Sequence, residues 1–440
     1  MKLSRRQAIL LLGAVVFIGA LIVLFYLNAR PKPNNAASIK LSAWGTEDKA
    51  ALMNVFGAYP YATISYTQLD PATYDQTLLN ALAAGTGPDI FEISNRSLPR
   101  WKSVLAPMPA DYAQQFNALQ MQNDFPDVVA NDFELPTSDL RGVPGAGSSS
   151  LYALPLSIDT LAMFYNKDLF NSANITYPPK TWDDVQADIM KLRLLNAQGQ
   201  VTRAGAALGG SETSIPNAPD LLSLLMLQNG TQMVSGDFSS AQFASGGANG
   251  AGQNAFDFYL QFANPTFQDY TWNDQMGAAI DNFAAGNAAI IFGYQSDMAT
   301  IRQKAPYLNF GVAAMPQPSN ATIAINYPKY EGFAVAKASP QAAVAWNAIL
   351  YLTTNNAIEK MYVSATGKPP ALRQEIQADM NDPNLSIFAS QALTAKSWYQ
   401  ANDEEINAIF NEAIQKVLGG QADSVTALGQ AQAAVNALMR

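Results

Sequence analysis

The sequence predicts an α/β protein built from two lobes, and three observations favour this fold class. The chain has 440 residues, more than a single hydrophobic core usually organises. Strand-like and helix-like segments alternate between residues 39 and 94, which is typical of parallel strands joined by crossover helices. Residues 152–184 then form a further strand, loop and helix start in the middle of the chain.

The composition excludes several kinds of chemistry. The chain has no cysteine and no histidine, which removes thiol and imidazole nucleophiles, histidine bases, disulfides and the usual zinc sites. The formal net charge of −9 argues against nucleic acid as a partner. We therefore expect no metal, no cofactor and no nucleic-acid interface.

The N-terminus predicts a membrane anchor. Lys2, Arg5 and Arg6 precede residues 9–27, which carry no charge, and a helix that spans a bilayer needs roughly 20 apolar residues. The basic flank predicts a cytoplasmic N-terminus. We expect a signal-anchor helix at residues 1–29, a linker at 30–38 and the remaining chain outside the cytoplasm, with a cleaved signal peptide as the alternative.

The first lobe begins with three predicted strands, at residues 39–43, 62–69 and 89–93. A helix should connect the first two and run to about residue 58. A second helix should start at Asp70 with a first-turn proline and stop at the Gly85-Thr86-Gly87-Pro88 turn. Ligands bind outside the carboxyl ends of such strands. The side chains just after the first and third strands are therefore candidates for a site.

The rest of the chain predicts mostly helices with a few strands. Thr181 is a natural N-cap followed by Asp184 three residues later. We expect a short strand at 205–209, a buried strand at 290–292 and another at 330–335. Helices are expected at residues 220–228, 255–262, 272–283, 342–354 and 404–418.

Five short motifs resemble those of the extracellular solute-binding proteins of the maltose-binding type. They are Gly87-Pro88-Asp89-Ile90, Leu154-Pro155-Leu156, Tyr165-Asn166-Lys167-Asp168-Leu169, Pro179-Lys180-Thr181-Trp182 and the segment 286–293. The resemblance extends from about residue 39 to the end. It implies the type II periplasmic-binding-protein fold, a two-lobed venus flytrap with a three-segment hinge. Lobe 1 would comprise residues 39–156 and 317–366, and lobe 2 residues 157–316 and 367–440.

The same resemblance implies that a sugar binds between the lobes. Aromatic faces pack on sugar rings, while amides, hydroxyls and charged side chains bind the hydroxyl groups. Asp159 matches a sugar-contacting acid of that family. The candidate residues, each of which could instead be structural, are Trp44, Gly45, Thr46, Glu47, Asn95, Arg96, Asp159, Ser211, Glu212, Trp272, Tyr294, Gln295, Tyr330, Glu331 and Trp398.

The leading hypothesis is a monomeric, non-catalytic protein that captures a sugar or oligosaccharide outside the cytoplasm, extracellularly or in a periplasm. It would deliver this ligand to an ABC transporter permease. One alternative keeps the fold and changes the ligand to an anion or another small solute. A second is an extracellular glycoside hydrolase, which needs two carboxylates across the cleft, from Glu47, Asp159 and Glu212.

Overall fold

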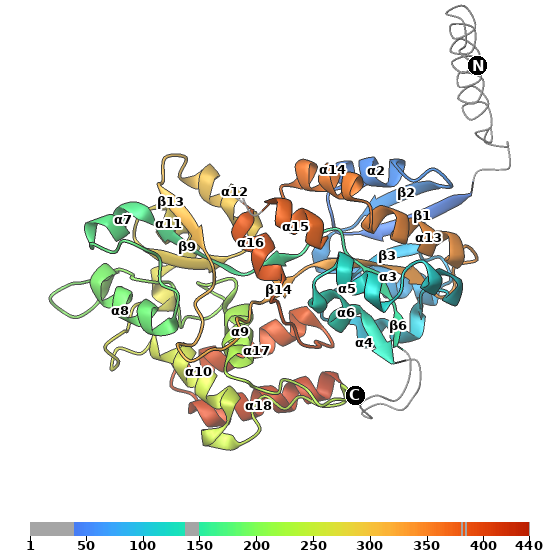
Figure 1. Cartoon of the computed structure of the whole chain (residues 1–440). Coiled ribbons are helices and arrows are strands. Elements are labelled where there is room, and N and C mark those ends of the chain that lie inside the picture. The colour runs from blue at the N-terminus through green and yellow to red at the C-terminus, as the bar shows by residue number, and fades with distance from the viewer. Residues whose placement is uncertain (1–38, 137–148, 380–381, 383–384, 440) are drawn as a thin grey trace, which may run out of the picture.

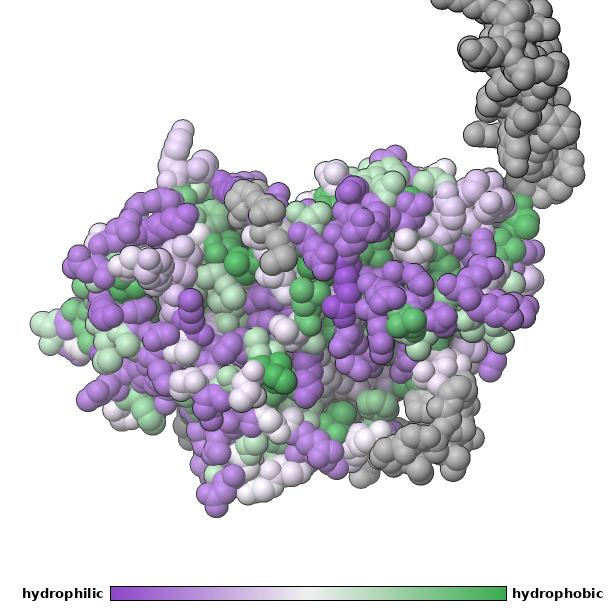
Figure 2. Space-filling model, viewed as in Figure 1, coloured by the Kyte–Doolittle hydropathy of each residue, from purple (hydrophilic) through white to green (hydrophobic). Residues whose placement is uncertain are grey.

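The computed structural model describes residues 39–136, 149–379, 382 and 385–439. The predicted anchor at 1–29 and the linker at 30–38 lie outside the described residues. Within the described part, no helix is both long and apolar enough to cross a membrane. Two separate hydrophobic cores define two lobes, which lie side by side in Figure 1. Figure 2 shows a mainly hydrophilic face, with hydrophobic residues in small patches.

Lobe 1 is built on a mixed sheet with the strand order β2-β1-β3-β15-β4, and β7 also pairs with β15. β1 runs parallel to β2 and β3, whereas β15 is antiparallel to β3. The four strands predicted for this lobe are therefore confirmed. The strands are β1 (Lys40–Gly45), β2 (Thr63–Gln68), β3 (Ile90–Ser94), β4 (Leu105–Ala106), β7 (Ala153–Leu154) and β15 (Glu331–Ala336), and β5 (Glu134–Pro136) pairs with β6 (Ser149–Leu151) beside them.

The helices of lobe 1 begin and end where local chemistry favours it. Asp48 accepts a hydrogen bond from the Ala51 N–H and caps the first of them. Gly85, at φ +70°, follows the second in the left-handed conformation that glycine adopts most readily. The helices are α2 (Lys49–Gly57), α3 (Tyr74–Ala83), α4 (Leu98–Trp101), α5 (Ala118–Asp124), α6 (Asp127–Phe133), α13 (Ala342–Thr353), α14 (Asn356–Thr366) and α15 (Arg373–Asp379).

Lobe 2 contains a three-stranded antiparallel sheet in the order β12-β9-β13. Its strands are β9 (Ala162–Asn166), β12 (Ile290–Gly293) and β13 (Phe310–Ala313), and a small hairpin joins β10 (Leu194–Leu195) to β11 (Val201–Arg203). Helices surround this sheet: α7 (Lys167–Ser172), α8 (Trp182–Leu192), α9 (Ala218–Gln228), α10 (Ala251–Gln261), α11 (Ala279–Ala284), α12 (Gln295–Lys304), α17 (Asp403–Leu418) and α18 (Ser424–Leu438). α16 (Ser386–Ala392) lies at the junction, with Phe388 in one core and Ala389 in the other.

Two sequence predictions for lobe 2 were wrong. The expected strand at 205–209 forms no ladder, and only Ala204 bridges to Ala288 there. The expected helix at 272–283 is a 3-10 turn, Asp274–Met276, followed by α11. The Asp274 carboxylate binds Ser211 and Ser214 across the loop, and Gly277, at φ +80°, turns the chain before α11 begins.

The lobes are joined where β8 (Asp159–Thr160) pairs with β14 (Pro328–Lys329). Tyr327 packs in the core of lobe 2 and Tyr330 in that of lobe 1, so the returning chain crosses at β14 and not at residue 317. Ala371 and Leu372 still pack in lobe 1, beyond the expected boundary at 367. The Glu359 carboxylate accepts hydrogen bonds from both of their backbone N–H groups and holds this segment on lobe 1.

Candidate functional site

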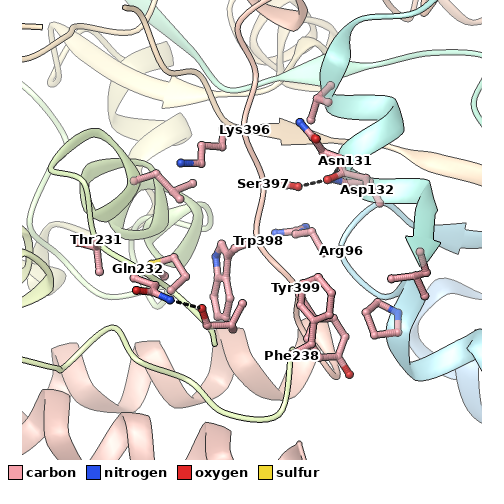
Figure 3. A pocket seen from close by; sticks show the side chains of 17 residues that line it. Arg96, Asn131, Asp132, Thr231, Gln232, Phe238, Lys396, Ser397, Trp398 and Tyr399 are labelled. Atoms are coloured by element: carbon pink, nitrogen blue, oxygen red, sulfur yellow. Dashed lines mark hydrogen bonds between the residues drawn. The ribbon is translucent and has the colours of Figure 1, made fainter. Parts of the chain in front are cut away.

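A cavity of about 410 Å³ lies between the lobes. The segment that carries Trp398 runs between lobe 1 and lobe 2 and forms one side of it, as Figure 3 shows. The lining residues are Asn95, Arg96, Pro99, Val128, Asn131, Asp132 and Leu135 from lobe 1, and Leu227, Thr231, Gln232, Met233, Val234, Phe238, Lys396, Ser397, Trp398 and Tyr399 from lobe 2 and the crossing segment. Both lobes therefore contribute side chains to one cavity.

Three aromatic side chains line this cavity: Phe238, Trp398 and Tyr399. The rings of Phe238 and Tyr399 meet edge to face, with centroids 5.6 Å apart. Trp398 is 5% exposed, and its indole N–H donates to the Ser223 hydroxyl at 3.2 Å. These contacts fix the orientation of the rings, so that they offer a preformed apolar wall to a ligand.

Asp132 is the polar centre of the lobe 1 wall. Its carboxylate accepts hydrogen bonds from Asn95 Nδ2 at 2.9 Å, from the Tyr330 hydroxyl at 2.7 Å and from the Ser397 hydroxyl. Burial raises the pKa of Asp132 to about 6, although these three hydrogen bonds act to lower it. The sequence predicted Asn95 and Tyr330 as site residues, and the structure makes both of them partners of Asp132.

Arg96 connects the lobes. Its guanidinium lies 3.0 Å from Asp220 at the start of α9 and 3.2 Å from Asp403 at the start of α17, and it donates to the Tyr327 hydroxyl at 3.1 Å. Burial by itself lowers the pKa of Arg96, but the charges of Asp403 and Asp220 and the Tyr327 hydroxyl raise it well above its ordinary value. Arg96 is therefore a fixed positive charge in the interface between the lobes.

The polar network continues from Arg96 toward β8. The Tyr294 hydroxyl donates to the other Asp220 oxygen at 2.7 Å. The next residue, Gln295, donates its backbone N–H to Asp159 at 3.0 Å. Burial raises the pKa of Asp159 to about 7. Three predicted residues thus lie in one connected region at the junction of the lobes.

A second polar group lies at the carboxyl ends of β1 and β3. Glu47 accepts a hydrogen bond from the Tyr362 hydroxyl at 2.9 Å and forms an ion pair with Lys368. The Thr46 N–H donates to Glu92 at 2.7 Å. A side chain at Gly45 would place its Cβ 2.1 Å from the Glu92 carboxyl carbon, so the glycine makes room for this acid.

The acids of this group repel one another. Burial and the charge of Glu47 raise the pKa of Glu92 to about 7. Burial, Glu92 and Asp403 raise the pKa of Glu331 well above its ordinary value. Gly45, Thr46, Glu47 and Glu331, all predicted from the sequence, are therefore parts of one acidic edge of lobe 1.

Of the predicted residues, Asn95, Arg96 and Trp398 line the cavity, and four further candidates lie apart from it, as do those of the junction and of the acidic edge. Trp272 is fully buried in the core of lobe 2, with its indole N–H on Ser214, and Ser211 is buried against Asp274. Trp44 is half-buried and packs on the core of lobe 1. Burial and the charge of Asp220 raise the pKa of Glu212, whose backbone N–H donates to Asn411 at 2.9 Å.

Sequence reasoning missed several residues that the structure brings to the site, namely Asp132, Asp220, Phe238, Tyr399 and Asp403. One signal was available for Asp220: it is the only charged residue of a helix that is buried from Ala218 to Leu227, and a buried acid requires a partner. Asp132 and Phe238 lie in segments without a distinctive pattern. Among the described residues, no group of three or more acidic side chains could hold a metal ion.

Comparisons with known proteins agree with this architecture. The profile of the bacterial extracellular solute-binding protein family matches residues 42–359. A binding protein of Brucella abortus is 24% identical over 369 residues, which cover 83% of each chain. The solved structure of the sugar-binding protein MalE of Xanthomonas citri is 18% identical, covers 91% of this chain and 97% of its own, and has a TM-score of 0.71. A substrate-binding protein of Listeria monocytogenes in complex with cycloalternan is 18% identical, with coverage of 91% and 99% and a TM-score of 0.68.

Proposed function

This chain belongs to the bacterial extracellular solute-binding protein family, and from that premise we propose that it captures a sugar or oligosaccharide between its lobes. The ligand would be released to an ABC transporter permease. The observation that supports a sugar most directly is the cavity between the lobes, which combines aromatic rings with amide, hydroxyl and charged side chains. Sugars offer apolar C–H faces and many hydroxyl groups to such a surface.

We propose that Trp398 and Tyr399 pack against the sugar ring, while Asp132 and Arg96 bind its hydroxyl groups. Asn95 and Tyr330 would act through Asp132, because their polar atoms already bind that carboxylate. The remaining predicted residues of the junction and of the acidic edge would bind further sugar units of an oligosaccharide, either directly or through bridging water molecules. These residues are Gly45, Thr46, Glu47, Asp159, Glu212, Tyr294, Gln295 and Glu331. Trp44, Ser211 and Trp272 would support the fold around them.

Capture would proceed by movement of the two cores about the β8–β14 junction. A ligand that contacts both lobes binds the closed form more tightly than the open form and shifts the population toward it. Arg96 lies in lobe 1 and binds Asp220 and Asp403 of lobe 2, so it would stabilise the closed form.

We propose a monomer that works outside the cytoplasm, extracellular or periplasmic, held to the membrane through residues 1–29. The resemblance to solute-binding proteins supports a permease as partner. The net charge of −9 supports a small-molecule ligand over nucleic acid.

Binding without catalysis is better supported than either alternative. Glu47 is already paired with Lys368 and Tyr362, and Asp159 accepts two backbone N–H groups. These contacts give both carboxylates partners within the protein, which favours a binding role over a hydrolase role. An anionic ligand is also less favoured, because Asp220 and Asp403 already balance the charge of Arg96.

Isothermal titration calorimetry with a panel of mono- and oligosaccharides tests this function. At least one neutral sugar should bind with an affinity that depends little on salt. Trp398→Ala should weaken that binding at least tenfold, whereas Tyr307→Ala, at a fully exposed lobe 2 position, should leave it unchanged. A panel without any binding sugar contradicts the proposal, and affinity that falls steeply with salt would favour an anion.

A further inference from the structure

Four tyrosines cluster on the outer side of lobe 1 and are here called the tyrosine strip: Tyr61, Tyr112 and Tyr351 lie around Tyr59, which is itself buried at 4% exposure. The Tyr59 ring meets the rings of Tyr61 and Tyr351 edge to face, with centroids 5.6 Å and 5.7 Å away. Burial, and at high pH repulsion from the phenolates of Tyr112 and Tyr61, raise the pKa of Tyr59 to about 12.

The tyrosine strip follows one face of α13. The Tyr112 hydroxyl donates to the Ala343 carbonyl at 3.0 Å, and the Tyr59 hydroxyl donates to Asn347 at 2.8 Å. Ala343, Asn347 and Tyr351 are spaced four residues apart, so they share a face of the helix. The strip is thus a fixed surface that the helix and two loops hold together.

The helix and the loop that carry Tyr351, Tyr59 and Tyr61 are uncharged, and Tyr61 and Tyr351 are open to solvent, while the exposed charges Asp111 and Lys40 lie beside Tyr112 and opposite Thr63. α13 has no charged residue in its sequence AAVAWNAILYLT, and residues 57–63, GAYPYAT, have none either. Tyr61 is 68% exposed and Tyr351 is 37% exposed. The exposed side chains are amphipathic, with an aromatic body and a hydroxyl tip.

The tyrosine strip lies where the chain enters lobe 1. The Thr63 N–H, two residues after Tyr61, donates to the Ile39 carbonyl at 2.8 Å. In Figure 1, α13 lies at the end of lobe 1 that faces away from lobe 2, close to the start of β1. Twelve residue steps separate Ile39 from Leu27, the last residue of the uncharged N-terminal run, and they span at most about 40 Å.

We propose that the tyrosine strip rests in the headgroup region of the membrane that holds the predicted N-terminal anchor. Tyrosine rings concentrate at that depth of a bilayer, because one end is apolar and the other forms hydrogen bonds. The strip carries no basic residue and the chain is acidic, so the lipid would be zwitterionic and not anionic.

The cysteine-free chain allows a direct test with one fluorophore at a time. The full-length Tyr61→Cys variant, labelled at that cysteine, is reconstituted into phosphatidylcholine vesicles whose acyl chains are brominated near the glycerol end. The full-length Tyr307→Cys variant, labelled at the fully exposed lobe 2 position, is the matched control. A Tyr351→Cys variant provides a second position on the strip.

The proposal predicts at least twofold stronger quenching by brominated lipid at positions 61 and 351 than at position 307. Equal quenching at all three positions overturns it, and so does a full-length protein that fails to float with the vesicles. Shielding of position 61 from a water-soluble quencher without quenching by the lipid would assign the strip to contact with a second copy of this chain instead, and would also overturn the proposal.

Discussion

Arg96 shows at the residue scale how burial and charge oppose each other at the junction of the lobes. The side chain is 2% exposed, and an unpaired charge there would be costly. Asp220 and Asp403 balance it, and each aspartate in turn depends on the same guanidinium. Removing one partner of a buried pair leaves the other charge uncompensated, which costs about 3–5 kcal/mol.

Arg96→Met, which keeps an apolar stem, should therefore lower the free energy of unfolding by about 3 kcal/mol or more. The matched control is Arg100→Met, because the Arg100–Asp75 pair is 24% and 48% exposed and should contribute about 1 kcal/mol or less. Urea unfolding of both variants measures the difference. Equal losses of unfolding free energy in the two variants would show that Arg96 contributes no more to stability than an exposed ion pair does.

Glu359 offers a second test at the residue scale, through pH. Burial raises the pKa of this carboxyl to about 8, although the N–H groups of Leu372 and Ala371 act to lower it. Because the folded pKa lies above the unfolded one, the folded state binds the extra proton between about pH 4.5 and 8. The contribution of Glu359 to stability is therefore fully present below about pH 4.5 and is lost as the pH rises through 8.

Glu359→Gln removes this titration. We expect the stability of the natural protein to fall relative to the variant, by up to about 1.4 kcal/mol per pH unit between pH 5 and 8. Urea unfolding at each pH measures it, with Glu412→Gln as the control because that carboxylate is 62% exposed. If the free energy of unfolding depended on pH in the same way for Glu359→Gln and for the natural protein, the raised pKa of Glu359 would be contradicted.

At the scale of elements, the sequence predicted most of what local chemistry decides. The strands of lobe 1 and the helix after Thr181 were correct, because turn residues and hydrophobic period mark them. The helix at 272–283 failed because the contacts of Asp274 with Ser211 and Ser214 join residues about sixty positions apart. No local pattern contains that information.

The residues of the candidate site were also predictable only where a local sequence pattern marks them. Strand ends pointed to Glu47 and Arg96: Arg96 lies at the junction of the lobes, and Glu47 lies in the acidic edge of lobe 1. Asp132 and Phe238 could not be found in this way, because only the approach of the two lobes brings them into one cavity.

The capping box of α8 gives a prediction at this scale. The Thr181 hydroxyl accepts from the Asp184 N–H at 3.1 Å, and the Asp184 carboxylate accepts from the Thr181 N–H at 3.1 Å. Thr181→Ala should lower the free energy of unfolding by about 1 kcal/mol, whereas Thr181→Ser keeps the hydroxyl and should cost only a few tenths. Urea unfolding of the two variants measures this, and equal losses would mean that the hydroxyl contributes nothing.

At the scale of the whole molecule, two cores meet at a junction, and a cavity lies between the two lobes. The chain crosses between the lobes near β8, β14 and α16, and residues of both lobes line the cavity. A ligand held by both walls links binding to the relative position of the lobes. The central claim is therefore that binding of a sugar brings the two lobes closer together.

The distance between the lobes tests that claim most directly. In the cysteine-free chain, cysteines replacing Lys49 on lobe 1 and Tyr307 on lobe 2 accept a pair of fluorophores, and energy transfer reports their separation with and without a binding sugar. The sugar should shift the distribution to shorter distances, and Trp398→Ala should require a higher sugar concentration for the same shift. A distribution that stays unchanged while calorimetry shows saturation with the sugar would contradict capture by closure.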